Sequence, residues 1–221
     1  QLKGMGWNVV SGINNVLFGT SSNYIHAQGK EDFDTDQLSK GYATLATDGV
    51  KAAKLATKFN ILFEHMDIVY KGSRKSFKFS NLLLNPFELQ HRTEMANQIA
   101  PMIALMFNTK VADGVTLWDV YDKDGNFKDK YKKYQEDWSQ DLDAFTENKF
   151  TKFRDRIIEI NKNNHGNYDP NSVLLLTKTT VGQMVIQFRR WMLEQFNVRF
   201  GGKLWNKQLG RYTKGRYRVL G

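Results

Sequence analysis

The sequence contains no cysteine, only three prolines and no long hydrophobic run. Without cysteine the chain cannot form a disulfide framework, a thiolate metal site or a cysteine nucleophile. Its longest apolar run, from Ile99 to Phe107, is too short to cross a bilayer, which takes about 20 residues. The N-terminal residues also lack the basic and then apolar order of a signal peptide. Hydrophobic residues make up 41% of the chain, which is typical of a globular protein with a sizeable core.

Acidic residues are nearly absent from the C-terminal end. The formal net charge of the chain is +9, and residues 189–221 hold nine basic residues against one acid, Glu194. A near-neutral body with a basic end indicates an anionic partner. The chain opens on Gln1 rather than on methionine, and we expect it to be a fragment of a longer polypeptide.

The spacing of apolar residues predicts three long helices, over residues 31–59, 85–107 and 172–200. We expect Thr35 or Asp36 to cap the first of them. Asn85 is a suitable cap for the second, with Pro86 at its first position and a kink at Pro101. Gly201 ends the third helix.

The remaining segments carry weaker signals. The charged stretch 128–164, with its aromatic anchors, predicts one or two solvent-facing helices. Alternating residues around Asp124-Gly125 and around Lys214-Gly215 predict two small β-hairpins.

These signals predict a mainly α fold, an irregular multi-helix bundle with one or two small β-hairpins. We divide the chain into four regions: 1–110, rich in small residues and helical; 111–135, a hairpin connection; 136–200, helical; and 201–221, a basic aromatic hairpin.

Two glycines suggest close packing near the N-terminus. Gly12 and Gly19 lie one heptad apart on a helix with Val9, Ile13 and Leu17. Small residues on one face let another backbone approach, in soluble cores and in membrane helices alike. Tight packing in a soluble core is favoured, because the asparagines of this segment would be costly in lipid. A membrane-active helix is the alternative.

Several polar groups could in principle bind metal or act in catalysis. Glu88 and His91 have the Glu-x-x-His spacing of di-iron bundles, and Glu64, His65 and Asp67 are further ligand types. A di-iron site needs a second such motif, which the sequence lacks, so a capping glutamate and a hydrogen-bonded histidine are the preferred interpretation.

His91 also opens a polar strip along the second helix, with Glu94, Asn97 and Gln98. The strip must face either water or an interhelical network. Catalysis by His91 and Glu94 is the weaker interpretation, because no nucleophile or oxyanion motif accompanies them.

Asp122, Asp124 and Asn126 imitate the start of a calcium loop. The loop fails at its sixth and twelfth positions, where Phe127 and Lys133 replace the required glycine and glutamate. Phosphate-loop, nucleophile-elbow and zinc-protease motifs are also missing from the sequence. We therefore predict no catalytic residues, no metal, no cofactor and no enzymatic activity.

The basic end remains as the candidate site. Cations bind phosphates and aromatic rings stack on bases, so single-stranded nucleic acid would fit it. Trp, Tyr and Arg are equally the hot-spot residues of protein interfaces, and we favour that interpretation. The predicted contact residues are Arg189, Arg190, Trp191, Arg199, Lys203, Trp205, Lys207, Arg211, Tyr212, Lys214, Arg216, Tyr217 and Arg218.

The same segment carries a resemblance. "QFRRWMLEQFNVRFGG", followed by the Gly210, Tyr212, Gly215 and Tyr217 pattern, resembles a segment of the large virion proteins of crAss-like tailed bacteriophages. "FELQHRTEMANQIAPMIALMFNTKV" and "LWDVYDKDGNFK" are similar to the same proteins. The likeness spans most of the chain, from about residue 8 to the end.

The resemblance implies a helical piece of a very large structural polypeptide. Some of these proteins are packaged as internal cargo in the capsid or tail and ejected into the host with the genome, and the resemblance implies this role. The implied partners are other virion proteins of the tail, portal or capsid, in several copies, with contact to phage DNA and to a membrane during ejection. The implied location is the virion interior, then the host cytoplasm or envelope. Neighbouring proteins of these particles carry RNA polymerase activity, but the Asp-x-Asp-x-Asp-Gly cluster of polymerases is missing here.

Overall fold

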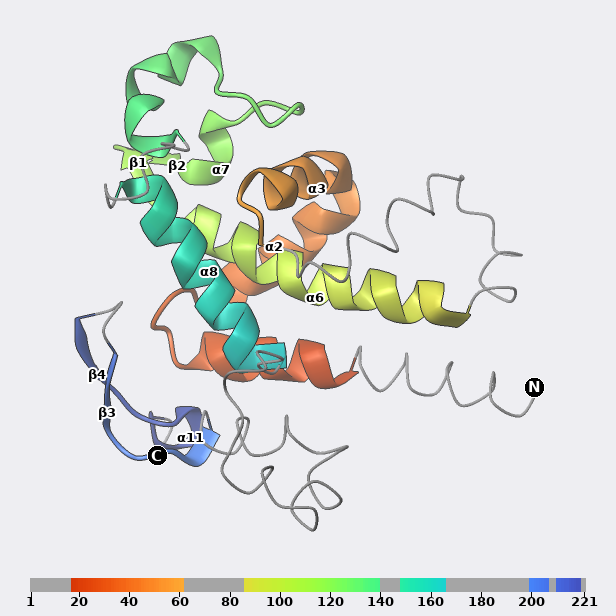
Figure 1. Cartoon of the computed structure of the whole chain (residues 1–221), viewed down its shortest axis with the longest axis vertical. Helices are drawn as coiled ribbons and strands as arrows, with labels where there is room; N and C mark the ends of the chain where they lie inside the picture. Colours follow the sequence, from red (N-terminus) through yellow and green to blue (C-terminus); the bar gives the residue numbers. More distant parts are fainter. Residues whose placement is uncertain (1–16, 62–85, 140–147, 166–198, 207–209, 220–221) are drawn as a thin grey trace, which may run out of the picture. The chain divides into compact units, whose positions relative to one another are not determined.

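The computed structural model describes residues 17–61, 86–139, 148–165, 199–206 and 210–219 (Figure 1). The fold is mainly helical with two small two-stranded antiparallel sheets, which confirms the predicted fold class. The chain divides into two compact units, Gln1–Ile157 and Ile158–Gly221. In the part of the chain that is described, no helix is long and apolar enough to span a membrane.

The first unit begins with a helix over residues 17–28, followed by α2 (Thr35–Thr47) and α3 (Gly49–Lys58). We expected Thr35 or Asp36 to cap α2, but the cap is Asp34. Asp34 and Gln37 form a reciprocal capping box. The predicted single helix 31–59 is also wrong. It breaks at Asp48, whose backbone leaves the helical region at φ −128° and ψ 38°.

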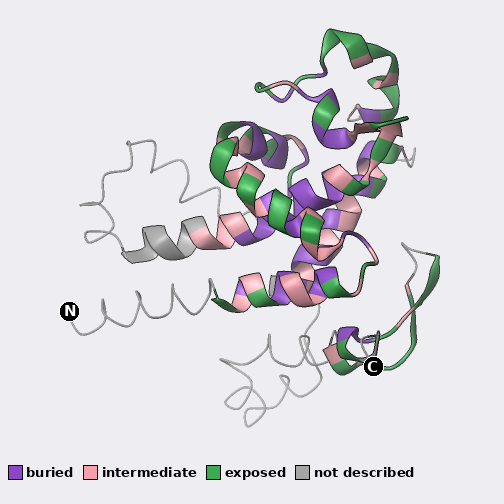
Figure 2. Cartoon of the chain, turned by 180° about the vertical axis from the view of Figure 1, so that it is seen from behind, coloured by how far each residue is buried: buried purple, intermediate pink, exposed green. Residues whose placement is uncertain are grey.

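Helix α6 (Pro86–Asn108) starts at Pro86, as predicted, and runs on through Pro101. It packs against α2 and α3, and among its residues whose burial is described, 97–106 are buried (Figure 2). The contact with α2 is close because Gly41 carries no side chain. A Cβ added there would lie 2.7 Å from the carbonyl oxygen of Ala100. Gly41 therefore sets the distance between these two helices.

The first hairpin lies earlier than predicted. Strands β1 (Lys110–Ala112) and β2 (Val115–Thr116) pair across Gly114, whose φ of 71° favours glycine. The expected strand after residue 116 is instead helix α7 (Leu117–Val120), capped by Thr116 and Asp119. The predicted turn at Asp124-Gly125 is present, but Tyr121 and Phe127 on either side of it form an isolated bridge and not two strands.

The charged stretch 128–164 contributes side chains to the core. It forms two 3-10 turns, η1 (Asp129–Tyr134) and η2 (Glu136–Trp138), and then α8 (Lys149–His165). Trp138, Phe150 and Phe153 are buried, so this region is not simply solvent-facing. Phe150 and Phe153 stack around Phe59 of the loop after α3, at ring centroid distances of 4.8 and 4.9 Å.

Lysines of α3 hold the segment after β2 in place. The Lys51 ammonium donates to the Trp118 carbonyl at 2.9 Å and lies 4.1 Å from the centroid of the Trp118 ring. Lys58 donates to the Gly125 carbonyl at 2.8 Å. Burial lowers the pKa of both lysines, with the nearby Lys128 lowering that of Lys51 further. Carbonyl oxygens and aromatic rings replace part of the water around these two ammonium groups.

The second unit contains the end of α8, strands β3 (Leu204–Asn206) and β4 (Arg211–Thr213), and helix α11 (Arg216–Val219). The predicted turn at Lys214-Gly215 is wrong, because β4 ends just before it and a helix follows. Of the predicted helix 172–200, only Arg199 and Phe200 are described, and both are helical. The proposed ligands Glu64, His65 and Asp67, together with Gly12, lie outside the described residues.

Candidate macromolecular interface

The β3–β4 hairpin displays an aromatic pair. Trp205 and Tyr212 are direct cross-strand partners, and their rings meet edge to face with centroids 5.1 Å apart. Strand residues alternate between faces, so the pairs Leu204–Thr213 and Asn206–Arg211 lie on the opposite face. The Lys203 ammonium lies 4.7 Å from the centroid of the Tyr212 ring, which places a cation on the aromatic side.

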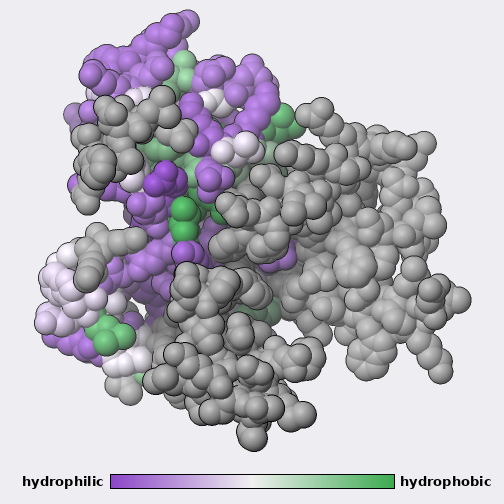
Figure 3. All heavy atoms as spheres, viewed as in Figure 1, coloured by the Kyte–Doolittle hydropathy of each residue, from purple (hydrophilic) through white to green (hydrophobic). Residues whose placement is uncertain are grey.

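This pair is open to solvent. Trp205 is 53% exposed and Tyr212 is 59% exposed, and on the opposite face Leu204 is 68% exposed. A two-stranded ribbon cannot bury both of its faces. In the space-filling view the described residues of this end are mostly mid-scale or hydrophilic, with a small hydrophobic patch (Figure 3). Exposed large side chains gathered in one place mark a contact surface.

A glycine contact supports the hairpin from its base. The Gly215 amide donates to the Gly201 carbonyl at 3.0 Å, and a Cβ added to Gly215 would lie 2.6 Å from the Arg199 carbonyl oxygen. Beside this contact, the rings of Phe200 and Tyr217 meet with centroids 4.9 Å apart. Gly215 therefore serves close packing and not the turn that the sequence pattern suggested.

The described C-terminal residues 199–206 and 210–219 include cations and no acid. Lys203, Arg211 and Lys214 are exposed. Arg216, which is one of the predicted contact residues, is buried, with 7% of its surface exposed. Glu159 of α8 accepts a hydrogen bond from the Asn206 side-chain amide at 3.0 Å. The surface is therefore positive around its aromatic pair.

The structure brings together part of the predicted set. Arg199, Lys203, Trp205, Arg211, Tyr212, Lys214, Arg216 and Tyr217 lie in the described C-terminal segments. Arg189, Arg190, Trp191 and Lys207 lie outside the described residues, and Arg218 lies in α11 with its side chain undescribed. Sequence reasoning missed Leu204 and Phe200, which are exposed at 68% and 43%. Leu204 stands next to Trp205 in a basic segment, and this adjacent apolar pair was the available signal for Leu204.

The structure describes part of the polar strip that the sequence predicted on α6. Asn97 belongs to an interhelical network, which is one of the two environments expected for the strip. Its side-chain carbonyl accepts hydrogen bonds from the hydroxyls of Tyr42 at 2.9 Å and Thr20 at 3.2 Å. The Asn23 amide donates to Tyr42 at 2.9 Å and to the Asn97 backbone at 2.8 Å. Burial raises the pKa of Tyr42, and these hydrogen bonds offset only part of that effect. Gln98 is buried as well, and the side chains of Glu88 and His91 are undescribed.

The glycine of the N-terminal helix packs as expected. A Cβ added to Gly19 would collide with the side chain of Asn97. This supports tight helix packing at Gly19, which leaves room for the amide network of the core.

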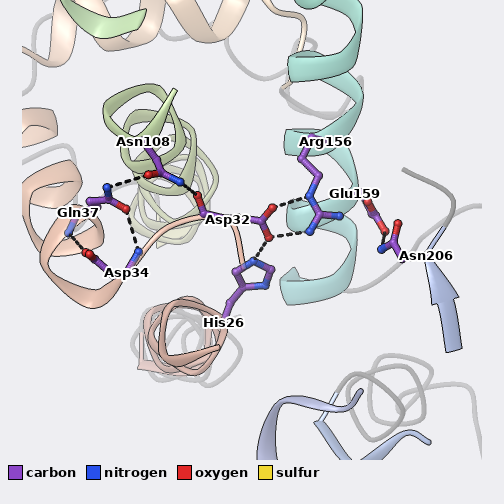
Figure 4. Close-up of polar contacts among 8 residues, drawn as sticks. All are labelled: His26, Asp32, Asp34, Gln37, Asn108, Arg156, Glu159 and Asn206. Carbon is purple, nitrogen blue, oxygen red and sulfur yellow. Dashed lines mark hydrogen bonds and ion pairs between the residues drawn. The ribbon is translucent and has the colours of Figure 1, made fainter. Parts of the chain in front are cut away.

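A second polar cluster joins three distant segments (Figure 4). Asp32, in the loop before α2, accepts two hydrogen bonds from Arg156 of α8, at 2.6 and 2.7 Å. Its second oxygen also lies 2.7 Å from Nε2 of His26. Burial would raise the pKa of Asp32, but the hydrogen bonds and charges of His26 and Arg156 outweigh it and hold that pKa well below the usual range. Asn108 of α6 donates to the Asp32 carbonyl at 2.6 Å.

This cluster connects three segments of the fold, and its side chains are not accessible to a substrate. Asp32 and His26 are 4% and 1% exposed, so a substrate could not reach them without rearrangement. Within the described segments, no group of three or more acidic or histidine residues could hold a metal ion. The calcium-like loop is occupied by its own backbone, because the Asp122 carboxylate accepts from the amides of Asp124 and Asn126. The hydrogen bond from the Asn126 backbone amide is the main cause that lowers the pKa of Asp122.

Comparison of the chain with family models, with curated proteins and with solved structures finds no match.

Proposed function

We propose that this chain is a structural protein of a tailed-bacteriophage virion, without enzymatic activity. It is packaged as internal cargo of the capsid or tail and ejected with the genome. The proposal is supported by the motif resemblance and by a fold whose described polar clusters are used for packing. Its partners are tail, portal or capsid proteins, which it contacts through the C-terminal end.

The single observation that carries a contact function is the exposed Trp205–Tyr212 pair. Interface hot spots are enriched in Trp, Tyr and Arg and are ringed by polar residues. Here the aromatic pair has exposed cations around it and no acid among the described C-terminal residues. An isolated globular protein gains nothing from leaving two large rings in water.

Peptide mapping by mass spectrometry on purified phage particles tests this proposal. Peptides from residues 17–61 and 86–139 should appear in the particles, together with peptides from a longer polypeptide on either side. A protein detected only in infected cells, and absent from washed particles, would refute the virion assignment.

A second candidate function is nucleic-acid binding through the same basic end. It is favoured by the cations around the aromatic pair and by the lack of any acid among the described C-terminal residues. The two functions differ in their sensitivity to mutation. A protein interface predicts that Trp205→Ala or Tyr217→Ala prevents assembly while single lysine changes do little. Phosphate binding predicts graded losses for every cation and a steep salt dependence.

A further inference from the structure

We infer that the Lys203–Trp205–Tyr212 face of the β3–β4 hairpin is a stacking platform for single-stranded nucleic acid. The inference rests on the second candidate function above and deepens it by naming the ligand and the face that binds it. Single strands are bound by cationic grooves in which aromatic rings stack on successive bases. The three side chains named supply both parts of that chemistry.

The geometry places rings and charge on one side of the ribbon. Trp205 and Tyr212 face each other across the two strands, and each leaves more than half of its surface exposed. The Lys203 ammonium, 4.7 Å from the Tyr212 centroid, lies within reach of a phosphate next to a base stacked on this pair. Trp and Tyr side chains have only two rotatable bonds, so they lose little conformational freedom when a base stacks on them.

The positive charge of this end favours an anionic ligand, and the phosphate backbone of a nucleic acid is one. Lys203 lies against the Tyr212 ring and the exposed Lys214 follows β4, whereas Arg211 pairs with Asn206 on the opposite face. Residues 199–206 and 210–219 contain no carboxylate. A double helix hides its bases in the stack, so exposed rings would find no partner there. A single strand presents the π-face of every base, and aromatic stacking is therefore tolerant of sequence.

Fluorescence anisotropy with the full chain tests the platform. The probes are labelled oligo-dT, oligo-rU, a duplex of equal length and an abasic oligonucleotide of equal length. We expect oligo-dT or oligo-rU to bind more tightly than the duplex and the abasic strand. Trp205→Ala and Tyr212→Ala should each weaken that binding by roughly 5- to 100-fold, the range that loss of one stacked base gives. The comparison of dT with rU identifies the type of strand.

The opposite face of the ribbon provides the control. Leu204→Ala removes a side chain that is 68% exposed and lies on the other face, so binding should not change. Trp205→Phe keeps a ring and should retain most of the affinity, which separates stacking from loss of the fold. Lys203→Ala should reduce the slope of log affinity against log salt by about one, the value for one phosphate contact.

Three outcomes would overturn the inference. Equal binding of the abasic and dT strands, with no effect of Trp205→Ala, would show phosphate contact alone; the second candidate function would then stand without the platform. Equal losses for Leu204→Ala and Trp205→Ala would show a general effect on the hairpin. No binding of any oligonucleotide would refute both the platform and the second candidate function, and would leave the virion proposal to the particle experiment.

Discussion

Replacing Asp32 with asparagine should destabilise the first unit strongly. The wild-type carboxylate is 3% exposed at its side chain and joins Arg156 and His26. Asparagine has almost the same shape, so the change removes charge without creating a cavity. The Arg156 guanidinium, 11% exposed, would then lie in the protein without its counter-charge.

The magnitude follows from the burial of both partners. Removing one partner of a buried ion pair costs about 3–5 kcal/mol, because the remaining charge is uncompensated. For a unit of this size, a loss of that order lowers the melting temperature by roughly 6–20 °C. The exposed pair of Lys54 and Asp124 is the matched control. Its side chains are 45% and 71% exposed, so Asp124→Ala should cost about 1 kcal/mol or less.

The pH dependence gives an independent signature. The pKa of Asp32 is lowered in the folded state, so its stabilisation is present above the pKa of an unfolded aspartate, about 3.9. The stabilisation is lost as the pH falls from there through the lowered folded pKa. The difference in stability between wild type and Asp32→Asn should therefore be constant above about pH 5 and shrink towards pH 2.

Urea unfolding followed by far-ultraviolet circular dichroism measures both effects. The reasoning would be refuted if Asp32→Asn and Asp124→Ala cost the same, because burial would then have no influence. It would also fail if the Asp32→Asn difference stayed constant down to pH 2, because the carboxylate would then not be held ionised by its partners.

Two further substitutions test the packing of α2 and α6. Gly41→Ala should destabilise the fold by about 1–3 kcal/mol, because the added Cβ would press on the Ala100 carbonyl. Gly49→Ala is the control: nothing lies within 4 Å of its added Cβ, so stability should change by less than about 1 kcal/mol. Equal shifts in melting temperature for the two variants would contradict this reasoning. Asn97→Ala should cost about 1–3 kcal/mol, because the Tyr42 hydroxyl loses its acceptor, and urea unfolding that matches wild type would exclude a role for the network.

Local signals in the sequence explain which helices could be predicted. Pro86 fixes the start of α6, since proline suits a first helical turn, and the apolar run after it has no other use than burial. The break at Asp48 has a local signal that the prediction passed over, because the Asp48-Gly49 dipeptide is typical of turns. Its backbone conformation depends on where α3 must lie to pack against α6.

The polar clusters show why composition alone is insufficient. Asp32 and Arg156 are 124 residues apart in the chain, and neither has a neighbour in the sequence that indicates the other. Only the folded topology makes them partners. Trp205 and Tyr212, by contrast, were predicted as contact residues because they stand among basic residues in one short segment. The sequence did not show that Trp205 pairs with Tyr212, and this pairing places the turn of the hairpin before Arg211 and not at Gly215.

Gly215→Ala tests whether the hairpin depends on its base. A two-stranded hairpin is marginal in isolation, so β3 and β4 need contacts beyond their own ladder. The new Cβ would lie 2.6 Å from both the Arg199 carbonyl oxygen and the Gly201 nitrogen, and backbone atoms cannot move aside as a flexible side chain can. We expect this base contact to open, at a cost of about 1–3 kcal/mol.

Hydrogen exchange of the β3–β4 amides measures that opening directly. Exchange at Leu204–Asn206 and Arg211–Thr213 should quicken in Gly215→Ala. Gly202→Ala is the control, because nothing lies within 4 Å of the added Cβ, and its exchange should match wild type. If both variants exchange like wild type, the ribbon holds its register without the base, and the support for the aromatic pair must come from its own cross-strand contacts.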